Sequence, residues 1–187
     1  LIVYFVDYSF SKKENTDIIL SILDNNGQVV WIDHHVSSKN VLASLPDEIC
    51  NDNRFKVIID TKYCATVLCY EYTSTIKNDK AFLNLVDSWD CWKHTVPDDR
   101  FFNEGFRSMH YLVEELGDIV GDILKNKDAE DRFINKMIDA GKEICTYIDT
   151  NNMELLSRYG FEFNINYFGN IYKCLALFQY GNSMVFG

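Results

Sequence analysis

An aspartate and two histidines stand together at positions 33–35, directly after the apolar run 29–32. A short run of β-branched and aromatic residues is typical of a buried strand. In open α/β sheets, ligands collect where the strands end, so the triplet is well placed to hold a metal ion or a phosphate group. A histidine pair in a surface loop is the alternative interpretation, which the triplet alone leaves open.

Two other apolar runs also end on an aspartate: residues 1–6 lead into Asp7, and residues 57–59 lead into Asp60. A further acidic and aromatic group occupies positions 87–92, where tryptophans packing beneath a solvated acidic turn are the simpler interpretation. Aspartate is also a common turn and helix-capping residue, which explains one or two such strand ends. We nevertheless expect the acidic strand ends to gather around the histidines.

This set of side chains suits oxygen and nitrogen coordination of Mn²⁺, Mg²⁺, Fe²⁺ or Zn²⁺. Two such ions, roughly 3.5 to 4 Å apart and joined by a bridging carboxylate, are the usual device for hydrolysing phosphodiesters. In such a centre Asp7 is placed to bridge the ions. His34 would bind one ion through one ring nitrogen while a neighbouring group fixes the other nitrogen, and His35 would contact a phosphate oxygen.

The composition of the 187-residue chain limits its class. With 47% hydrophobic residues the chain can bury a core, and we expect one domain plus part of a second. The net charge of −10 argues against binding long duplex nucleic acid, which needs Lys and Arg, but leaves short phosphodiesters open. We find no apolar run that would span a bilayer and no basic leader, so we expect a cytoplasmic protein without a membrane partner.

Cysteine usage fits the same compartment. The six cysteines are scattered without a C-x-x-C pair, and several lie in apolar runs where a small buried thiol suffices. We expect reduced thiols and no cysteine zinc cluster. Oligomeric state does not follow from the sequence.

The hydrophobic spacing predicts an α/β fold with a mostly parallel sheet flanked by helices. Residues 11–14 fit a capping box for a helix that ends by Gly27, and strand, helix and strand in succession favour parallel pairing. The connection 36–55 is expected to be mostly loop, with or without a helical turn, and a helix is expected over 61–73. Its small residues at 64–66 would let backbone N–H groups face a phosphate, or would simply pack tightly.

After Pro97 the pattern changes. We expect a turn at 98–100, a short aromatic segment at 101–106, and then helices, the clearest over 131–148 with apolar residues three and four apart. Strands of a second, smaller α/β unit are expected at 161–167, 171–179 and 185–186.

These motifs together resemble the DHH phosphoesterase superfamily. The resemblance rests on the strand ending at Asp7, the 33–35 triplet, Asp60 with Cys64-Ala65-Thr66, and the 87–92 group. Within that superfamily, an aspartate two residues before a tryptophan, followed by the stretch Phe102–Arg107, is most similar to the oligoribonuclease branch called NrnB-like. The similarity covers most of residues 1–110.

The resemblance implies a two-domain α/β protein that holds two Mn²⁺ ions, with Mg²⁺ or another divalent ion also possible, and hydrolyses short oligonucleotides or related phosphodiesters. Asp7 resembles the bridging metal ligand, and His34 resembles a ligand of one metal. Asp90 resembles the last metal-binding aspartate, and Asp87 is the alternative if the alignment shifts.

Other roles are implied around these ligands. His35 matches the phosphate-contacting, catalytic histidine, and Asp33 resembles a carboxylate that ligates or orients the centre. Asp60 has an undefined role near the substrate or metal. Arg107 would pair with a substrate phosphate, or make an ordinary surface salt bridge.

The resemblance also sets the expected boundaries. Residues 1–105 would form the DHH-type domain, 106–150 a helical connection, and 151–187 the start of the C-terminal substrate-binding domain. We expect a chain truncated at both ends, because the family's first motif would precede Leu1 and its second-domain motif would follow Gly187. Two alternatives stay open: a phosphohydrolase of cyclic nucleotides, cyclic dinucleotides or pyrophosphate, and a catalytically lapsed module that binds nucleotide or a protein.

Overall fold

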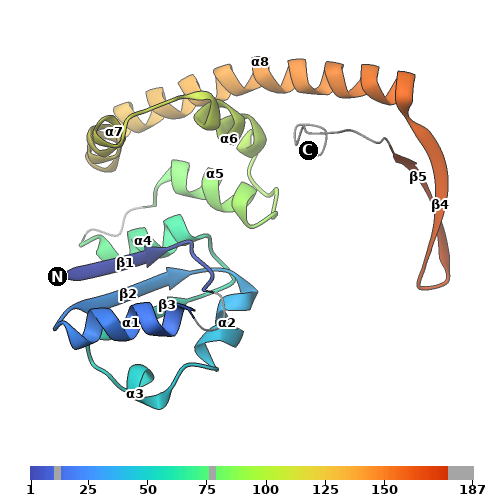
Figure 1. Cartoon of the computed structure of the whole chain (residues 1–187). Coiled ribbons are helices and arrows are strands. Elements are labelled where there is room, and N and C mark those ends of the chain that lie inside the picture. Colours follow the sequence, from blue (N-terminus) through green and yellow to red (C-terminus); the bar gives the residue numbers. More distant parts are fainter. Residues whose placement is uncertain (11–13, 76–78, 177–187) are drawn as a thin grey trace. The chain divides into compact units, whose positions relative to one another are not determined.

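The computed structural model describes residues 1–10, 14–75 and 79–176 (Figure 1). Over these residues the chain has the predicted α/β character, with a three-stranded parallel sheet, eight helices and a separate two-stranded hairpin. It divides into two compact units, the first ending at Asp99 and the second beginning at Arg100.

The sheet of the first unit consists of β1 (Ile2–Val6), β2 (Gln28–Asp33) and β3 (Phe55–Ile59) in that order. All pairs are parallel, which confirms the pairing predicted from the sequence. The central strand β2 is buried along almost its whole length, as an uninterrupted apolar run requires. Val6 lies opposite Ile32, and Asp33 lies opposite Ile59, so the strands end together at one edge of the sheet.

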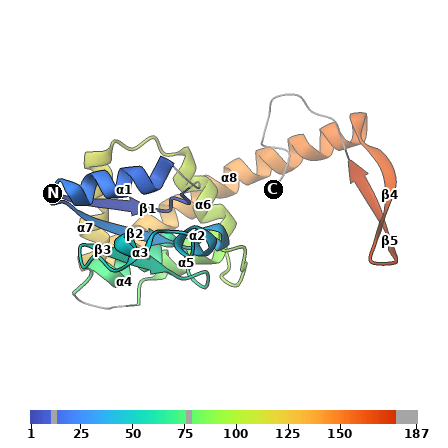
Figure 2. The same cartoon turned by 60° about the horizontal axis from the view of Figure 1, so that its bottom comes forward.

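Helices cover both faces of this sheet. Figures 1 and 2 show α1 (Glu14–Asp24) and α4 (Ala65–Thr73) on opposite sides of it. On the first side, α1 and the short α3 (Asp47–Cys50) contribute to a core of Phe10, Ile19, Leu23, Val29, Trp31, Ile49 and Phe55. On the second side, Leu68 of α4 packs on Val30 and Ile32. This layering leaves the edge where the strands end free for polar groups.

Three segments are more helical than the sequence predicts. The connection 36–55, for which at most a helical turn was expected, contains two helices, α2 (Val36–Leu42) and α3. Ile49 of α3 is fully buried, and a helical turn satisfies the backbone around it. The acidic group at 87–92 lies mostly in a helix, since α5 (Ala81–Asp90) continues through Asp90 and the turn is confined to Cys91 and Trp92. The expected turn and aromatic segment at 98–106 lie mostly within α6 (Asp99–Ser108).

The second unit contains α6, α7 (Val113–Lys125) and the 33-residue α8 (Lys127–Tyr159). The helix expected over 131–148 is confirmed as part of α8, which runs through position 150, where a domain boundary was expected. Phe102 of α6 packs edge-on against Phe133, with ring centroids 6.1 Å apart, and Arg100 forms two hydrogen bonds with Asp149. These contacts hold α6 along α8.

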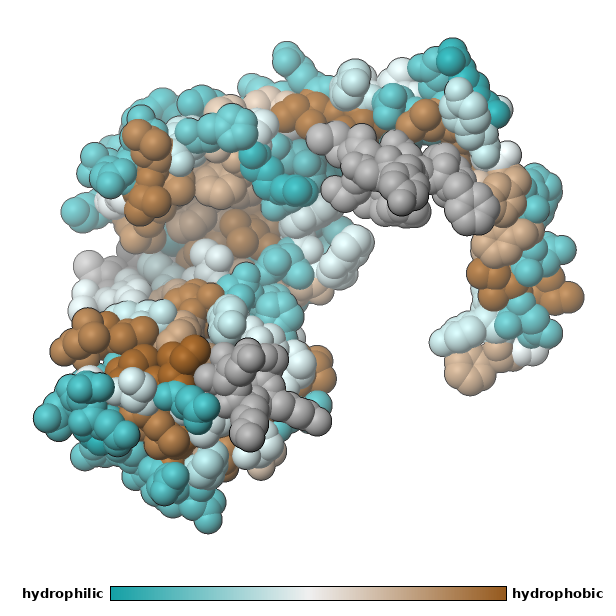
Figure 3. Space-filling view, in the orientation of Figure 1, coloured by the Kyte–Doolittle hydropathy of each residue, from teal (hydrophilic) through white to brown (hydrophobic). Residues whose placement is uncertain are grey.

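The hairpin consists of β4 (Phe161–Tyr167) and β5 (Asn170–Ala176), paired antiparallel. These strands agree with the predicted ones, although β5 is described only to Ala176. Their large apolar side chains are exposed, as the right side of Figure 3 shows: Phe161, Phe163, Ile165, Tyr167, Phe168, Ile171, Tyr172 and Leu175. The expected strand at 185–186 and the first residues of the expected capping box, 11–13, lie outside the described residues.

Among the described residues, no helix combines the length and the apolar character needed to cross a membrane.

We predict that Gly141→Ala destabilises the second unit. A Cβ atom at Gly141 would lie 1.7 Å from the carbonyl oxygen of Phe101, so α6 and α8 would have to separate. Overpacking of this kind costs about 1–3 kcal/mol of unfolding free energy, measurable by denaturant unfolding. Gly117→Ala in α7 is the matched control: nothing lies within 4 Å of its added Cβ, and it should be neutral or stabilising. Equal stability of the two variants would contradict close packing at Gly141.

Candidate functional site

Asp7 follows β1 and is fixed by its backbone. Its N–H donates to the carbonyl of Ile32, 3.0 Å away, and its φ of +53° lies in the left-handed region. The next residue is also held, because the indole N–H of the buried Trp31 donates to the carbonyl of Tyr8 at 2.9 Å. The end of β1 is therefore tied to β2, and the Asp7 side chain is placed over the end of that strand.

Asp33 is a fully buried carboxylate at the end of β2. Its Oδ2 accepts a hydrogen bond from the Ser38 hydroxyl. Its Oδ1 accepts from the N–H of His34 at 2.8 Å and from that of His35 at 3.4 Å, and the His35 ring nitrogen Nδ1 lies 2.8 Å away. Burial by itself raises the pKa of Asp33, but these hydrogen bonds outweigh it and hold the pKa below its ordinary value. The ionised side chain therefore organises the turn that carries both histidines.

His34 lies between two carboxylates from other elements. Its Nε2 is 3.2 Å from Oδ1 of Asp7 and 3.5 Å from Oδ2 of Asp90, which is the last residue of α5. Partial burial raises the pKa of Asp90. The structure thus brings together three candidate ligands that are far apart in the sequence.

His35 takes a different position. Its Nδ1 is bonded to Asp33 and lies 3.9 Å from Oδ1 of Asp7, and its side chain is 47% exposed. The hydrogen bond to Asp33 raises the pKa of His35. One ligating atom each from Asp7, Asp33, His34 and His35 lies within 4.8 Å of the others. Both carboxylate oxygens of Asp33 already accept hydrogen bonds from the chain. The side chains best able to bind a metal ion are therefore Asp7, His34 and Asp90.

Asp87 contacts residues next to the candidate ligands and is not itself free to bind an ion. Its Oδ1 accepts the N–H of Cys64 at 2.7 Å and lies 3.6 Å from the sulfur of Cys91, while its Oδ2 pairs with Lys93. The backbone N–H of Cys64, which was considered as a phosphate contact, therefore donates to a carboxylate of the protein itself. Asp87, the alternative ligand, has partners at both oxygens.

Burial raises the pKa of the Cys64 thiol to about 11 and that of Cys91 to about 12, so both keep their protons at neutral pH.

Asp60 and Arg107 are not among the side chains of this cluster. Asp60 ends β3, and its Oδ1 accepts the N–H of Lys62 at 2.9 Å. Arg107 belongs to the second unit, is 69% exposed, and contacts Glu104 at 3.4 Å, as an ordinary surface salt bridge does.

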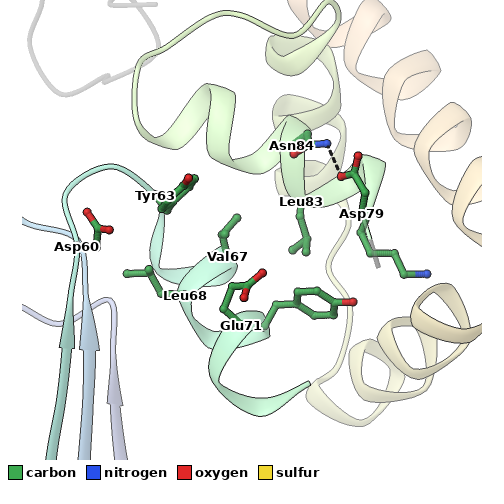
Figure 4. Close-up of a pocket in the computed structure, with 10 residues that line it drawn as sticks. Asp60, Tyr63, Val67, Leu68, Glu71, Asp79, Leu83 and Asn84 are labelled. Atoms are coloured by element: carbon green, nitrogen blue, oxygen red, sulfur yellow. Dashed lines mark hydrogen bonds between the residues drawn. The ribbon is translucent and has the colours of Figure 1, made fainter. Parts of the chain in front are cut away.

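A pocket of about 540 Å³ lies between α4 and α5 (Figure 4). Val67 and Leu83 line it from these two helices, and Asp60 stands at the end nearest the sheet. The lining includes three carboxylates and one lysine, and its full set is Asp60, Tyr63, Val67, Leu68, Tyr70, Glu71, Asp79, Lys80, Leu83 and Asn84. Like charge disfavours a phosphate there, so the pocket suits an uncharged or cationic group.

Three residues that contact the site, Ser38, Cys91 and Lys93, were not predicted from the sequence. Cys91 stands four residues after Asp87, a spacing that places two side chains on one face of a helix and was a usable signal for this contact. Ser38 and Lys93 carry no comparable signal, because their contacts depend on how α2 and the loop after α5 fold back.

Comparison of the chain with protein-family models, with curated proteins and with solved structures gives no match.

We predict that Asp33→Asn lowers the unfolding free energy of the metal-free protein at pH 7 by roughly 2–3 kcal/mol, because hydrogen bonds to a charged group are lost. The folded-state pKa of Asp33 lies below 3.8, so the ionised form stabilises the fold above that pH, and this contribution fades as the pH falls through the folded-state pKa. The gap between wild type and variant should therefore narrow in acid. Denaturant unfolding from pH 7 to pH 2 measures it, with the exposed Asp17→Asn as control. A gap independent of pH would contradict this role.

Proposed function

We propose that this protein is a metal-dependent phosphodiesterase of the DHH phosphoesterase type, acting on short oligonucleotides or related small phosphodiesters. The observation that carries the proposal is the position of His34, whose Nε2 lies 3.2 Å from Asp7 and 3.5 Å from Asp90. Support also comes from the order of the motifs along the chain, which resembles that superfamily.

The donor set fits a divalent ion such as Mn²⁺ or Mg²⁺. The carboxylates of Asp7 and Asp90 both lie beside the His34 imidazole. The cluster of possible ligands among the described residues, which is Asp7, Asp33, His34 and His35, contains no thiol. Asp7, His34 and Asp90 would hold the ion, and Asp7 would also be the carboxylate that contributes to binding a second one. A bound divalent ion would supply Lewis acidity toward water and toward the phosphoryl group.

His35 would act on the substrate rather than on the ion. Its Nδ1 is bonded to Asp33, so the ring is held in one orientation and its second nitrogen is available to a phosphate oxygen. Asp33 would serve as the orienting carboxylate, since its own oxygens already have partners. In this arrangement one histidine belongs to the ligand set and the other to proton transfer or phosphate binding.

Charge supports a short substrate. The chain carries a net charge of −10, and the pocket at Asp60 has three carboxylates and one lysine in its lining. The negative protein surface around the metal ion would repel the phosphates of a long nucleic acid. A dinucleotide or another small phosphodiester has few phosphates outside the metal site and would be repelled less.

We predict that the purified protein hydrolyses a labelled dinucleotide when Mn²⁺ is added. His34→Ala should lose Mn²⁺ binding in calorimetry together with hydrolysis, because a ligand is removed. His35→Ala should keep Mn²⁺ binding while kcat falls about 10²–10⁴-fold, as expected for loss of a proton-transfer group.

His110→Ala is the control, since this histidine is not part of the cluster, and it should retain both properties. Wild-type protein that binds no divalent ion would rule out the proposal. Mn²⁺ binding without hydrolysis of dinucleotides, cyclic nucleotides or pyrophosphate would replace the enzyme with a binding module.

A further inference from the structure

Each ring nitrogen of His34 has its own partner. Nε2 faces Asp7 and Asp90, while Nδ1 lies 3.8 Å from the sulfur of Cys91. The same sulfur lies 3.6 Å from Oδ1 of Asp87. Both distances suit hydrogen bonds to sulfur, which is both a weak donor and a weak acceptor. Cys91 therefore stands between a fixed carboxylate and the ring of a candidate metal ligand.

The carboxylate behind Cys91 is firmly held. The N–H of Cys64, at the start of α4, donates to Oδ1 of Asp87 at 2.7 Å, and Lys93 pairs with Oδ2. Cys91 itself caps the end of α5, and its N–H donates to the carbonyl of Asp87. A sulfur anchored in this way can fix a ring that it contacts.

We propose that Cys91 is a positioning residue: its sulfur accepts the Nδ1–H of His34 while its own S–H donates to Asp87, so that His34 presents an unprotonated Nε2 between Asp7 and Asp90. This rests on the proposed function, because a lone pair at Nε2 is needed only for binding an ion. Metal-binding histidines usually donate their second ring N–H to a carboxylate, a backbone carbonyl or water. Here a thiol is interposed between the carboxylate and the ring.

This role makes a chemical distinction between substitutions. Serine accepts one hydrogen bond and donates one, as the thiol does, whereas alanine does neither. Cys91→Ala should weaken Mn²⁺ binding about 10- to 100-fold, the usual effect of losing a partner of a metal-binding histidine, and Cys91→Ser should retain most of the affinity. Cys50→Ala, which removes an exposed thiol of the same unit, is the matched control and should bind as wild type does.

The first measurement is Mn²⁺ titration calorimetry on the four proteins, with circular dichroism to compare their folding. If Cys91→Ala binds Mn²⁺ as tightly as wild type, or if the serine and alanine variants weaken equally, the positioning role of Cys91 is wrong while the metal site stands. If wild type binds no Mn²⁺, the proposed function fails and the role of Cys91 fails with it.

The second measurement needs no metal. The ¹⁵N resonances of the His34 ring, observed by NMR in metal-free protein, report the hydrogen bond at each nitrogen. The Nδ1 resonance should shift in Cys91→Ala and stay near its wild-type position in Cys91→Ser. An Nδ1 resonance that is the same in the alanine variant and in wild type would overturn the contact with Cys91, whatever the calorimetry shows.

Discussion

The site depends on the hydrogen bonds that stabilise the buried carboxylate of Asp33. An ionised group without exposed surface is tolerated only when donors surround it, and here they come from Ser38, His34 and His35. One side chain thereby connects the end of β2, the beginning of α2 and the ring of a histidine. The turn that carries both imidazoles is thus defined by the need to satisfy a charge, and apolar packing beneath it only sets its position.

The strands and their common edge follow directly from the sequence. Each apolar run is short and stops on a polar residue, and parallel strands in register must end at the same side of a sheet. That geometry is enough to predict the approach of Asp7 to the 33–35 triplet. Strand geometry does not predict that Asp90 lies beside His34, because Asp90 belongs to the helix α5. Its role was predicted only from the order of the motifs along the chain.

The supporting contacts do not follow from the sequence. Cys91 and His34 are 57 residues apart, and Cys64 and Asp87 are 23 apart, so both contacts depend on how α5 lies against the end of the sheet. Hydrophobic periodicity predicts which face of a helix is buried, but it does not predict the position of the helix along its axis relative to the elements it packs against. A helical turn in the connection 36–55 was compatible with the sequence, but its place at α3 follows from the burial of Ile49 against the sheet, and the seven-residue α2 was not predicted.

The left-handed backbone at Asp7 also limits which side chain can stand there. Apart from glycine, aspartate and asparagine enter this conformation most readily, and a longer or branched residue meets a steric penalty. Glutamate carries the same charge but would add that penalty and a longer reach. The conformation of the main chain has therefore already selected the shorter acid, before any requirement of coordination chemistry applies.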